Sequence, residues 1–108
     1  MLSKSYRLKE REIKKIISRG KRFYGSVLTI RFFFAPVSGF AIVVSNKVSK
    51  KAVIRNRIRR QISEIVRLIM LPKLKNKIKA VIIVKTKNVT FKILKNNCEQ
   101  FLREANLI

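Results

Sequence analysis

The sequence predicts an α+β fold in which helices pack on a small β-sheet, within one domain that spans residues 1–108. The length of 108 residues lies in the usual range of a single domain. Hydrophobic residues make up 47% of the chain, enough to build a core. Segments with helical and with strand-like periodicity follow in the order α-β-β-α-β-α, which is typical of helices layered on a sheet.

The first predicted element is a short amphipathic helix over Glu10–Arg19. Ile13, Ile16 and Ile17 recur at helical spacing, and Gly20 follows as a stop. Two segments with the composition of β-strands come next, at residues 26–34 and 40–45, and we expect them to form an antiparallel pair across a turn at 36–39. Alternation divides the first segment into a core face (Leu28, Ile30, Phe32, Phe34) and an opposite face (Val27, Thr29, Arg31, Phe33).

The longest predicted element is a helix over residues 53–70, with one apolar stripe and a basic remaining surface. After a lysine-rich connector, residues 79–85 are typical of a short buried strand, and a strand–helix–strand unit favours parallel pairing with the strand before it. A last helix begins at about residue 90. The stripe of the long helix is Ile54, Ile58, Ile62, Ile65 and Ile69, and that of the last helix is Phe91, Leu94, Cys98, Phe101 and Ala105.

The charge balance points to a polyanionic partner. The chain has 27 Lys and Arg against 5 acidic residues, a net charge of +22. Nucleic acid fits this charge best, because neutralising phosphates with Lys and Arg releases condensed counterions. An anionic membrane surface is the alternative, but no apolar run approaches the roughly 20 residues that span a bilayer. Arg31 interrupts the most apolar stretch, residues 27–37, so we expect no membrane partner.

Most catalytic chemistry has no candidate residues here. The chain has no histidine and no aspartate, its glutamates are scattered, and no glycine-rich phosphate loop occurs. We therefore expect no catalytic residue, no metal site and no small-molecule substrate. Cys98 is the single cysteine and so forms no internal disulfide, which agrees with a reducing compartment. The start of the chain lacks the apolar core of a signal peptide, and we expect a cytoplasmic location.

The concentrated feature is the basic segment at residues 44–60, VSNKVSKKAVIRNRIRR. Its arginines present planar forks that bind phosphates bidentately, whereas its lysines act as point charges. The start of the long helix also directs free N–H groups toward an anion. A merely solvated basic face is the alternative interpretation. The candidate RNA-binding residues are Lys47, Lys50, Lys51, Arg55, Asn56, Arg57, Arg59, Arg60 and Arg67.

Three blocks of the sequence, in this order, resemble the bacterial ribonuclease P protein family. They are RLKEREIKKIISRGKRFYG at residues 7–25, the basic segment with its Arg-Asn-Arg box, and KAVIIVKTKNVTF at residues 79–91. The resemblance covers nearly the whole chain. It implies an αβββαβα sandwich with a left-handed crossover between parallel strands, and a protein subunit of an endoribonuclease whose catalysis and Mg²⁺ belong to the RNA subunit.

The resemblance also implies two binding surfaces. The basic segment would bind the catalytic RNA, and a cleft between the first helix and the sheet would bind the single-stranded 5′ leader of precursor tRNA. This chain has isoleucines on the first helix and Arg31 on the first long strand where the family often has aromatic residues, and Ser63 where it usually has arginine. Arg31 could compensate by contacting phosphate or stacking on a base. The candidate leader-binding residues are Ile13, Ile17, Thr29, Arg31 and Phe33.

Two other functions remain possible from the residues alone. A structural RNA-binding protein of the ribosomal type would have the same size and charge, although the ordered blocks around Arg55 would then have no explanation. A nuclease acting without RNA is disfavoured because acid–base groups are missing.

Overall fold

The computed structural model describes residues 6–108, which form an α+β fold in the predicted αβββαβα order. The long second helix continues beyond its regular part through a π-helical turn and a short further turn. The element bounds are α1 Glu10–Arg19, β1 Lys21–Tyr24, β2 Leu28–Phe34, β3 Gly39–Val43, α2 Ala52–Ile65, the π turn Val66–Met70, α3 Leu71–Lys73, β4 Ile78–Val84 and α4 Phe91–Glu104.

The four strands form one mixed sheet in the order β1-β2-β4-β3. β1 and β4 both pair with β2 in antiparallel fashion, and β3 pairs with β4 in parallel. The predicted parallel strand–helix–strand unit is therefore confirmed, since β3 reaches β4 through α2. The predicted antiparallel pair of residues 26–34 and 40–45 is wrong, because β4 lies between them. β4 suits this central place because both of its faces are largely apolar and buried.

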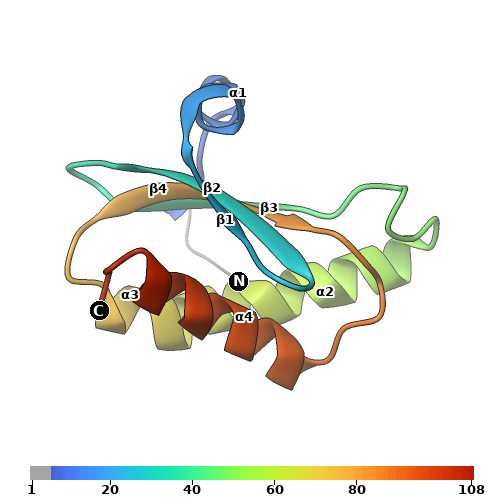
Figure 1. The fold of residues 1–108 in the computed structure, drawn as a ribbon. Helices are drawn as coiled ribbons and strands as arrows, with labels where there is room; N and C mark the ends of the chain where they lie inside the picture. Colours follow the sequence, from blue (N-terminus) through green and yellow to red (C-terminus); the bar gives the residue numbers. More distant parts are fainter. Residues whose placement is uncertain (1–5) are drawn as a thin grey trace.

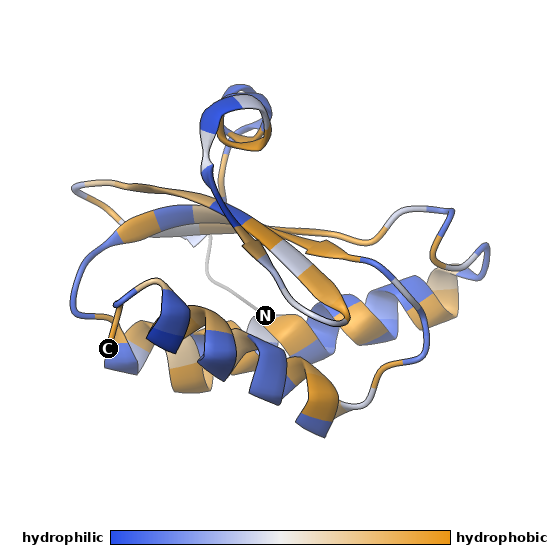
Figure 2. Ribbon diagram, in the orientation of Figure 1, coloured by the Kyte–Doolittle hydropathy of each residue, from blue (hydrophilic) through white to orange (hydrophobic). Residues whose placement is uncertain are grey.

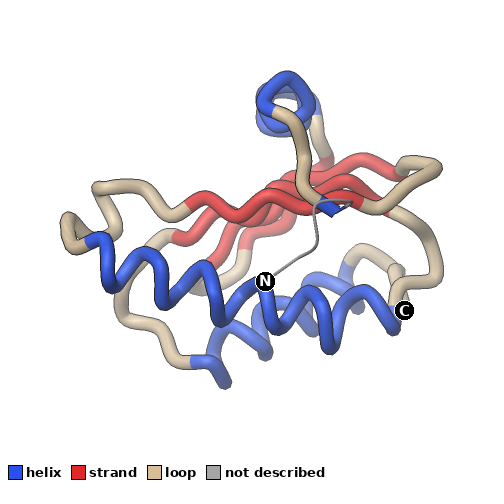
Figure 3. Tube along the Cα trace, turned by 180° about the vertical axis from the view of Figure 1, so that it is seen from behind, coloured by secondary structure: helices blue, strands red, loops and turns tan. Residues whose placement is uncertain are grey.

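Helices cover the two faces of the sheet unequally. α2 and α4 lie side by side under one face, and α1 alone crosses the other face (Figures 1 and 3). Figure 2 shows apolar residues on the sides of α2 and α4 that face the sheet and on the underside of α1. The main core lies between the sheet and the helix pair, so the α1 face carries much less helical cover.

The isoleucine stripe of α2 is confirmed, since Ile58, Ile62 and Ile65 are fully buried. The helix does not end at residue 70 as predicted but runs to Lys73. Its π turn precedes Pro72, which lacks an N–H and whose ring would clash with the carbonyl four residues earlier. A widened turn at Val66–Met70 accommodates the proline without ending the helix.

The phenylalanines of β2 divide differently from the prediction. Phe32 is buried as predicted and packs edge-on against Phe101 of α4, with ring centroids 5.2 Å apart. Phe34 was also assigned to the core, but it is 46% exposed. It is the last residue of β2, at the rim of the core, where it contacts the Phe32 ring and lies under the Lys21 ammonium.

The turn between β1 and β2 is fastened to α4. Asn97 of α4 is 5% exposed, and its Oδ1 accepts a hydrogen bond from the Val27 N–H at 3.2 Å. Gly25 N–H donates to the Leu28 carbonyl at 2.7 Å and closes the turn. A Cβ at Gly25 would lie 2.3 Å from Asn97 Oδ1, so the close approach requires glycine. This contact fixes the position of the β1 edge relative to the helical layer.

None of the helices within residues 6–108 is both long and apolar enough to cross a membrane.

Candidate RNA interface

The basic segment forms the loop after β3 and the first turns of α2. Two of its arginines are used to hold that loop. Arg55 Nη1 donates to the Ser49 carbonyl at 2.9 Å, and Arg59 Nη2 donates to the Val44 carbonyl at 3.3 Å. Both side chains are half-buried. Arg55 and Arg59 therefore combine their charge with a structural role that spacing alone did not indicate.

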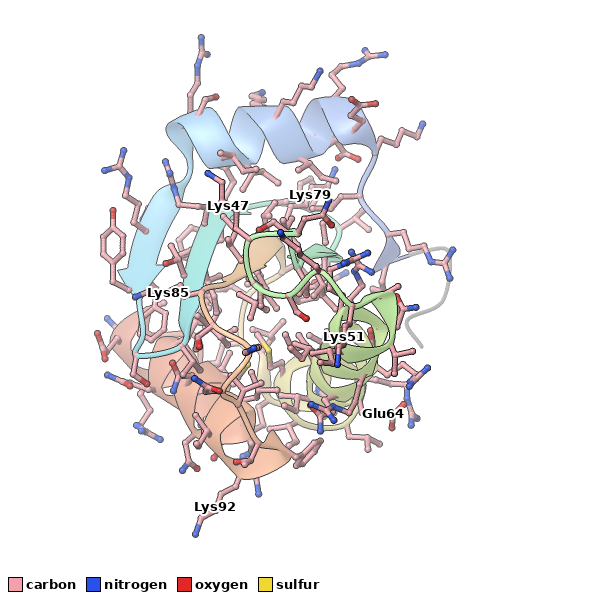
Figure 4. The ribbon with its side chains drawn as sticks, turned by 90° about the vertical axis from the view of Figure 1, so that its right-hand side faces the viewer. Lys47, Lys51, Glu64, Lys79, Lys85 and Lys92 are labelled. Carbon is pink, nitrogen blue, oxygen red and sulfur yellow. The ribbon has the colours of Figure 1, made fainter. Side chains whose placement is uncertain are left out.

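Other members of the basic segment remain at the surface. Lys47, Lys50, Lys51, Arg57 and Arg60 are all exposed. Asn56 is exposed too, and its Oδ1 accepts from Arg59 Nη1 at 3.0 Å, so its amide N–H groups can still donate to a bound acceptor. Figure 4 shows Lys47 on the loop and Lys51 at the start of α2. These predicted residues are therefore exposed on the loop after β3 and on the first turns of α2.

Arg67 lies farther along, in the π turn, and forms an ion pair with Glu64 at 2.7 Å. The hydrogen bond from Arg67 lowers the pKa of the Glu64 carboxyl. Arg67 therefore carries a partly neutralised charge at the edge of the basic surface. Ser63, which stands where the resembling family has arginine, is buried.

The second predicted surface lies where α1 crosses the sheet. Ile16 is the buried contact of α1 and is 2% exposed. Near the start of the helix, Glu12 forms an ion pair with Lys79 of β4, which is labelled in Figure 4. The hydrogen bond from Lys79 lowers the pKa of the Glu12 carboxyl. At the other end, Arg31 of β2 donates from Nε and Nη2 to the Gly20 carbonyl at 3.4 and 3.3 Å. Polar contacts thus fasten α1 at both ends.

The predicted leader-binding residues divide between the two sides of α1. Phe33 lines a pocket of about 390 Å³ with Glu12, Lys15 and neighbouring residues on one side of the helix. At 100° per residue, Ile13 and Ile17 lie on the opposite flank from Lys15. Ile17 is 38% exposed. The structure therefore does not bring Phe33 together with the two isoleucines.

Thr29 and Arg31 lie on the sheet face that α1 crosses, together with two residues that the sequence analysis missed. Register pairs Arg22 of β1 with Arg31 and Tyr24 with Thr29, and directly opposed residues of an antiparallel pair share a face. β1 is a short edge strand with two adjacent basic residues, so it has no strand-like apolar pattern. Only the pairing register of β1 with β2 shows that Arg22 and Tyr24 lie on this face.

Within residues 6–108, no group of three or more His, Cys, Asp or Glu side chains is arranged to hold a metal ion. The arrangement offers arginine forks, lysine charges and exposed apolar or aromatic side chains, which bind phosphates and bases.

Comparisons with known proteins agree on one family. The family model for ribonuclease P matches residues 2–106. The ribonuclease P protein component of Microcystis aeruginosa is 38% identical over 95% of this chain and 87% of its own length. That of a Synechocystis species is also 38% identical, over 95% of this chain and 82% of its own length.

A solved structure supports the fold. The Staphylococcus aureus RNase P protein superposes with a TM-score of 0.82, at 23% identity, over 96% of this chain and 98% of that one. The family match favours a ribonuclease P protein over the two alternatives, a ribosomal-type RNA-binding protein and a nuclease acting without RNA. The chain belongs to the ribonuclease P protein family and is a protein subunit of that tRNA-processing endoribonuclease.

Proposed function

We propose that this subunit binds the catalytic RNA of ribonuclease P through its basic segment, and the 5′ leader of precursor tRNA through the sheet face beside α1. In this assignment the protein positions substrate and screens phosphate repulsion, while the RNA subunit holds Mg²⁺ and performs the cleavage. The proposed RNA-subunit surface comprises Lys47, Lys50, Lys51, Arg55, Asn56, Arg57, Arg59, Arg60 and Arg67. The proposed leader surface comprises Ile13, Ile17, Thr29 and Arg31.

The observation that carries the proposal is the separation of the two surfaces. α2 lies under one face of the sheet and α1 crosses the other, so an RNA on α2 leaves the α1 face available (Figure 1). The exposed Arg57 and Arg60 suit phosphates, which carry no sequence information. The α1 face offers apolar side chains such as the exposed Ile17, which suit unstacked bases of a single strand.

Phe33 is not part of the proposed leader surface. It lies on the other side of α1 from Ile13 and Ile17, within the pocket lined by Glu12 and Lys15. In that pocket the Glu12 carboxylate is already paired with Lys79. Leader contact is therefore assigned to the flank of α1 on which Ile13 and Ile17 lie, next to Thr29 and Arg31.

Assembly with the RNA subunit tests the first surface. Arg57→Ala and Arg60→Ala should each weaken binding of the protein to its cognate RNA, measured by titration in Mg²⁺ without substrate. Lys92→Ala is the matched control, because Lys92 is an exposed cation on α4, away from the basic segment (Figure 4). Equal losses for all three variants would mean that binding follows net charge and not this surface.

Substrate affinity of the assembled enzyme tests the second surface. Wild-type holoenzyme should bind precursor tRNA more tightly than mature tRNA, and Ile17→Ser should reduce that difference while leaving assembly unchanged. A holoenzyme whose protein subunit gives no advantage to leader-bearing tRNA would contradict the assignment of the α1 face.

A further inference from the structure

We propose that Tyr24 is the aromatic stacking platform of the leader surface and holds one leader base at its β1 edge. This inference rests on the proposed leader surface and extends it by one strand. It assigns the stacking contact to a residue outside the first helix and outside β2, where the resembling family's aromatic residues are replaced by Ile13, Ile17 and Arg31.

The pairing register puts Tyr24 on the correct face. Tyr24 lies directly opposite Thr29 in the antiparallel β1–β2 pair, and Arg22 lies opposite Arg31. Opposed side chains share a face, so all four belong to the face that α1 crosses. Ile17 lies three residues before Gly20 on the same side of α1, and the Arg31 bond to the Gly20 carbonyl holds that end of the helix against this face. Apolar, basic and aromatic side chains thus follow one another from α1 toward β1.

Exposure separates Tyr24 from the other aromatic residues, all of which lie within residues 6–108. Tyr24 is 65% exposed. Phe23, Phe32, Phe40 and Phe101 are buried in the core. Tyr6 and Phe33 are half-buried, and Phe34 lies on the opposite face of β2 from Thr29. Phe91, which is 41% exposed, begins α4 in the other layer. A leader on the α1 face therefore has one strongly exposed ring available.

Charge around the ring favours a polyanion. Arg22 is exposed beside it on the α1 face. At the β1 edge Tyr24 also borders a groove of about 540 Å³, which Phe32, Phe34 and the end of α4 line as well, so this groove opens toward the helix pair and not toward the α1 face. Glu104 is the carboxylate of this groove, and it accepts a hydrogen bond from Gln100 at 2.6 Å. A base on the ring would place its flanking phosphates within reach of the arginines.

The ring also stands on a rigid support. The backbone beside it is closed by the Gly25 N–H bond to the Leu28 carbonyl, and the turn is fastened to α4 through Asn97. Lys85 Nζ donates to the Gly25 carbonyl at 3.0 Å and ties the same turn to the end of β4. Little backbone order is lost when a base stacks there, which favours binding.

Three variants in reconstituted holoenzyme test the proposal. Tyr24→Ala removes the ring, Tyr24→Phe keeps it, and Phe91→Ala removes a partly exposed ring from the other layer. Affinity is measured for mature tRNA and for precursor tRNAs whose leaders are lengthened one nucleotide at a time. Tyr24→Ala should weaken binding by about 5- to 150-fold, only for leaders beyond a threshold length. Tyr24→Phe and Phe91→Ala should bind every substrate like wild type.

An abasic scan of the leader identifies the stacked base. One abasic position should weaken wild-type binding by the same factor as Tyr24→Ala and should cause no additional loss in that variant, because both changes remove one contact. If wild type prefers precursor over mature tRNA and Tyr24→Ala shows the same preference, the assignment of Tyr24 is wrong but the leader surface still stands. Absence of that discrimination in wild type would instead overturn the leader surface itself.

Discussion

Asn97 joins α4 to the turn between β1 and β2 through one buried amide. Its Oδ1 accepts from the Val27 N–H, and its Nδ2 donates to the Ile93 carbonyl at 3.2 Å and to Ser26 Oγ at 3.1 Å. In the sequence this asparagine interrupts the apolar pattern of the last helix and gives no sign of its role. Val27 and Ser26 lie about seventy residues away, on a turn whose position depends on the whole sheet.

Removing this amide should destabilise the protein. Asn97→Ala leaves the Val27 N–H buried without its partner, which costs about 1–3 kcal/mol in the free energy of unfolding. Urea denaturation measures it. Asn96→Ala is the control, because Asn96 is exposed on the same helix and should change stability by no more than about 0.5 kcal/mol.

Cys98 behaves as a small apolar residue of the core, as its place on the stripe of α4 predicted. It is fully buried, and burial raises the pKa of its thiol to about 12. Since the thiolate is the reactive form, the folded protein should not react with a thiol reagent at pH 8, whereas the urea-unfolded protein should react at once. The absorbance of the group that the reagent releases measures the reaction rate in the folded and in the unfolded protein. Rapid reaction of the folded protein would show that α4 opens readily.

At the scale of the elements, the helices could be predicted because each carries its own periodicity. α1 matches its predicted bounds, and the stripes of α2 and α4 face the sheet. The order of the strands in the sheet could not be predicted from local periodicity. Insertion of β4 between β2 and β3 depends on which strand is apolar on both faces, and β1 depends on its pairing with β2. Both are long-range properties.

The attachment of α1 to the sheet should depend on pH. The hydrogen bond from Lys79 lowers the pKa of Glu12, so the ion pair contributes its full stability above the ordinary value of 4.5. That contribution is lost as the pH falls through the lower value of the folded protein. Both side chains are about a third exposed, so the contribution should not exceed about 1 kcal/mol.

Lys79→Met is the variant that tests this attachment. It should be slightly less stable than wild type at pH 7, and the difference should shrink toward zero as the pH is lowered below 4.5. Lys77→Met, at an exposed position before β4, serves as the control. Thermal unfolding over a pH series provides the data. A stability difference that stays constant with pH would mean that the pKa of Glu12 does not depend on Lys79.

At the scale of the whole molecule, the net charge of +22 requires a strong salt dependence of RNA binding. The logarithm of the association constant should fall linearly with the logarithm of salt concentration, by nearly one unit per neutralised duplex phosphate. Arg60→Ala should reduce the slope by about one. Arg55→Ala should also loosen the loop at Ser49, and an unchanged slope in both variants would remove these arginines from the interface.

The candidate site was predictable in part. The exposed residues of the basic segment could be predicted from local sequence, because helix periodicity places Arg57 and Arg60 at the surface. The structural bonds of Arg55 and Arg59 were hidden because they end on loop carbonyls. On the α1 face, the side occupied by Phe33 depends on the angle at which α1 crosses the sheet, which no local pattern specifies.

Site-specific cross-linking tests the two-surface account most directly, and the buried Cys98 makes it practicable because an introduced cysteine will be the reactive one. A photoactivatable group is placed at Ile17→Cys on α1 or at Val53→Cys on α2, where Val53 is 77% exposed among the basic residues. In holoenzyme with precursor tRNA, the first position should cross-link to the leader and the second to the RNA subunit. The reverse pattern, or cross-links from both positions to the same RNA, would contradict the account.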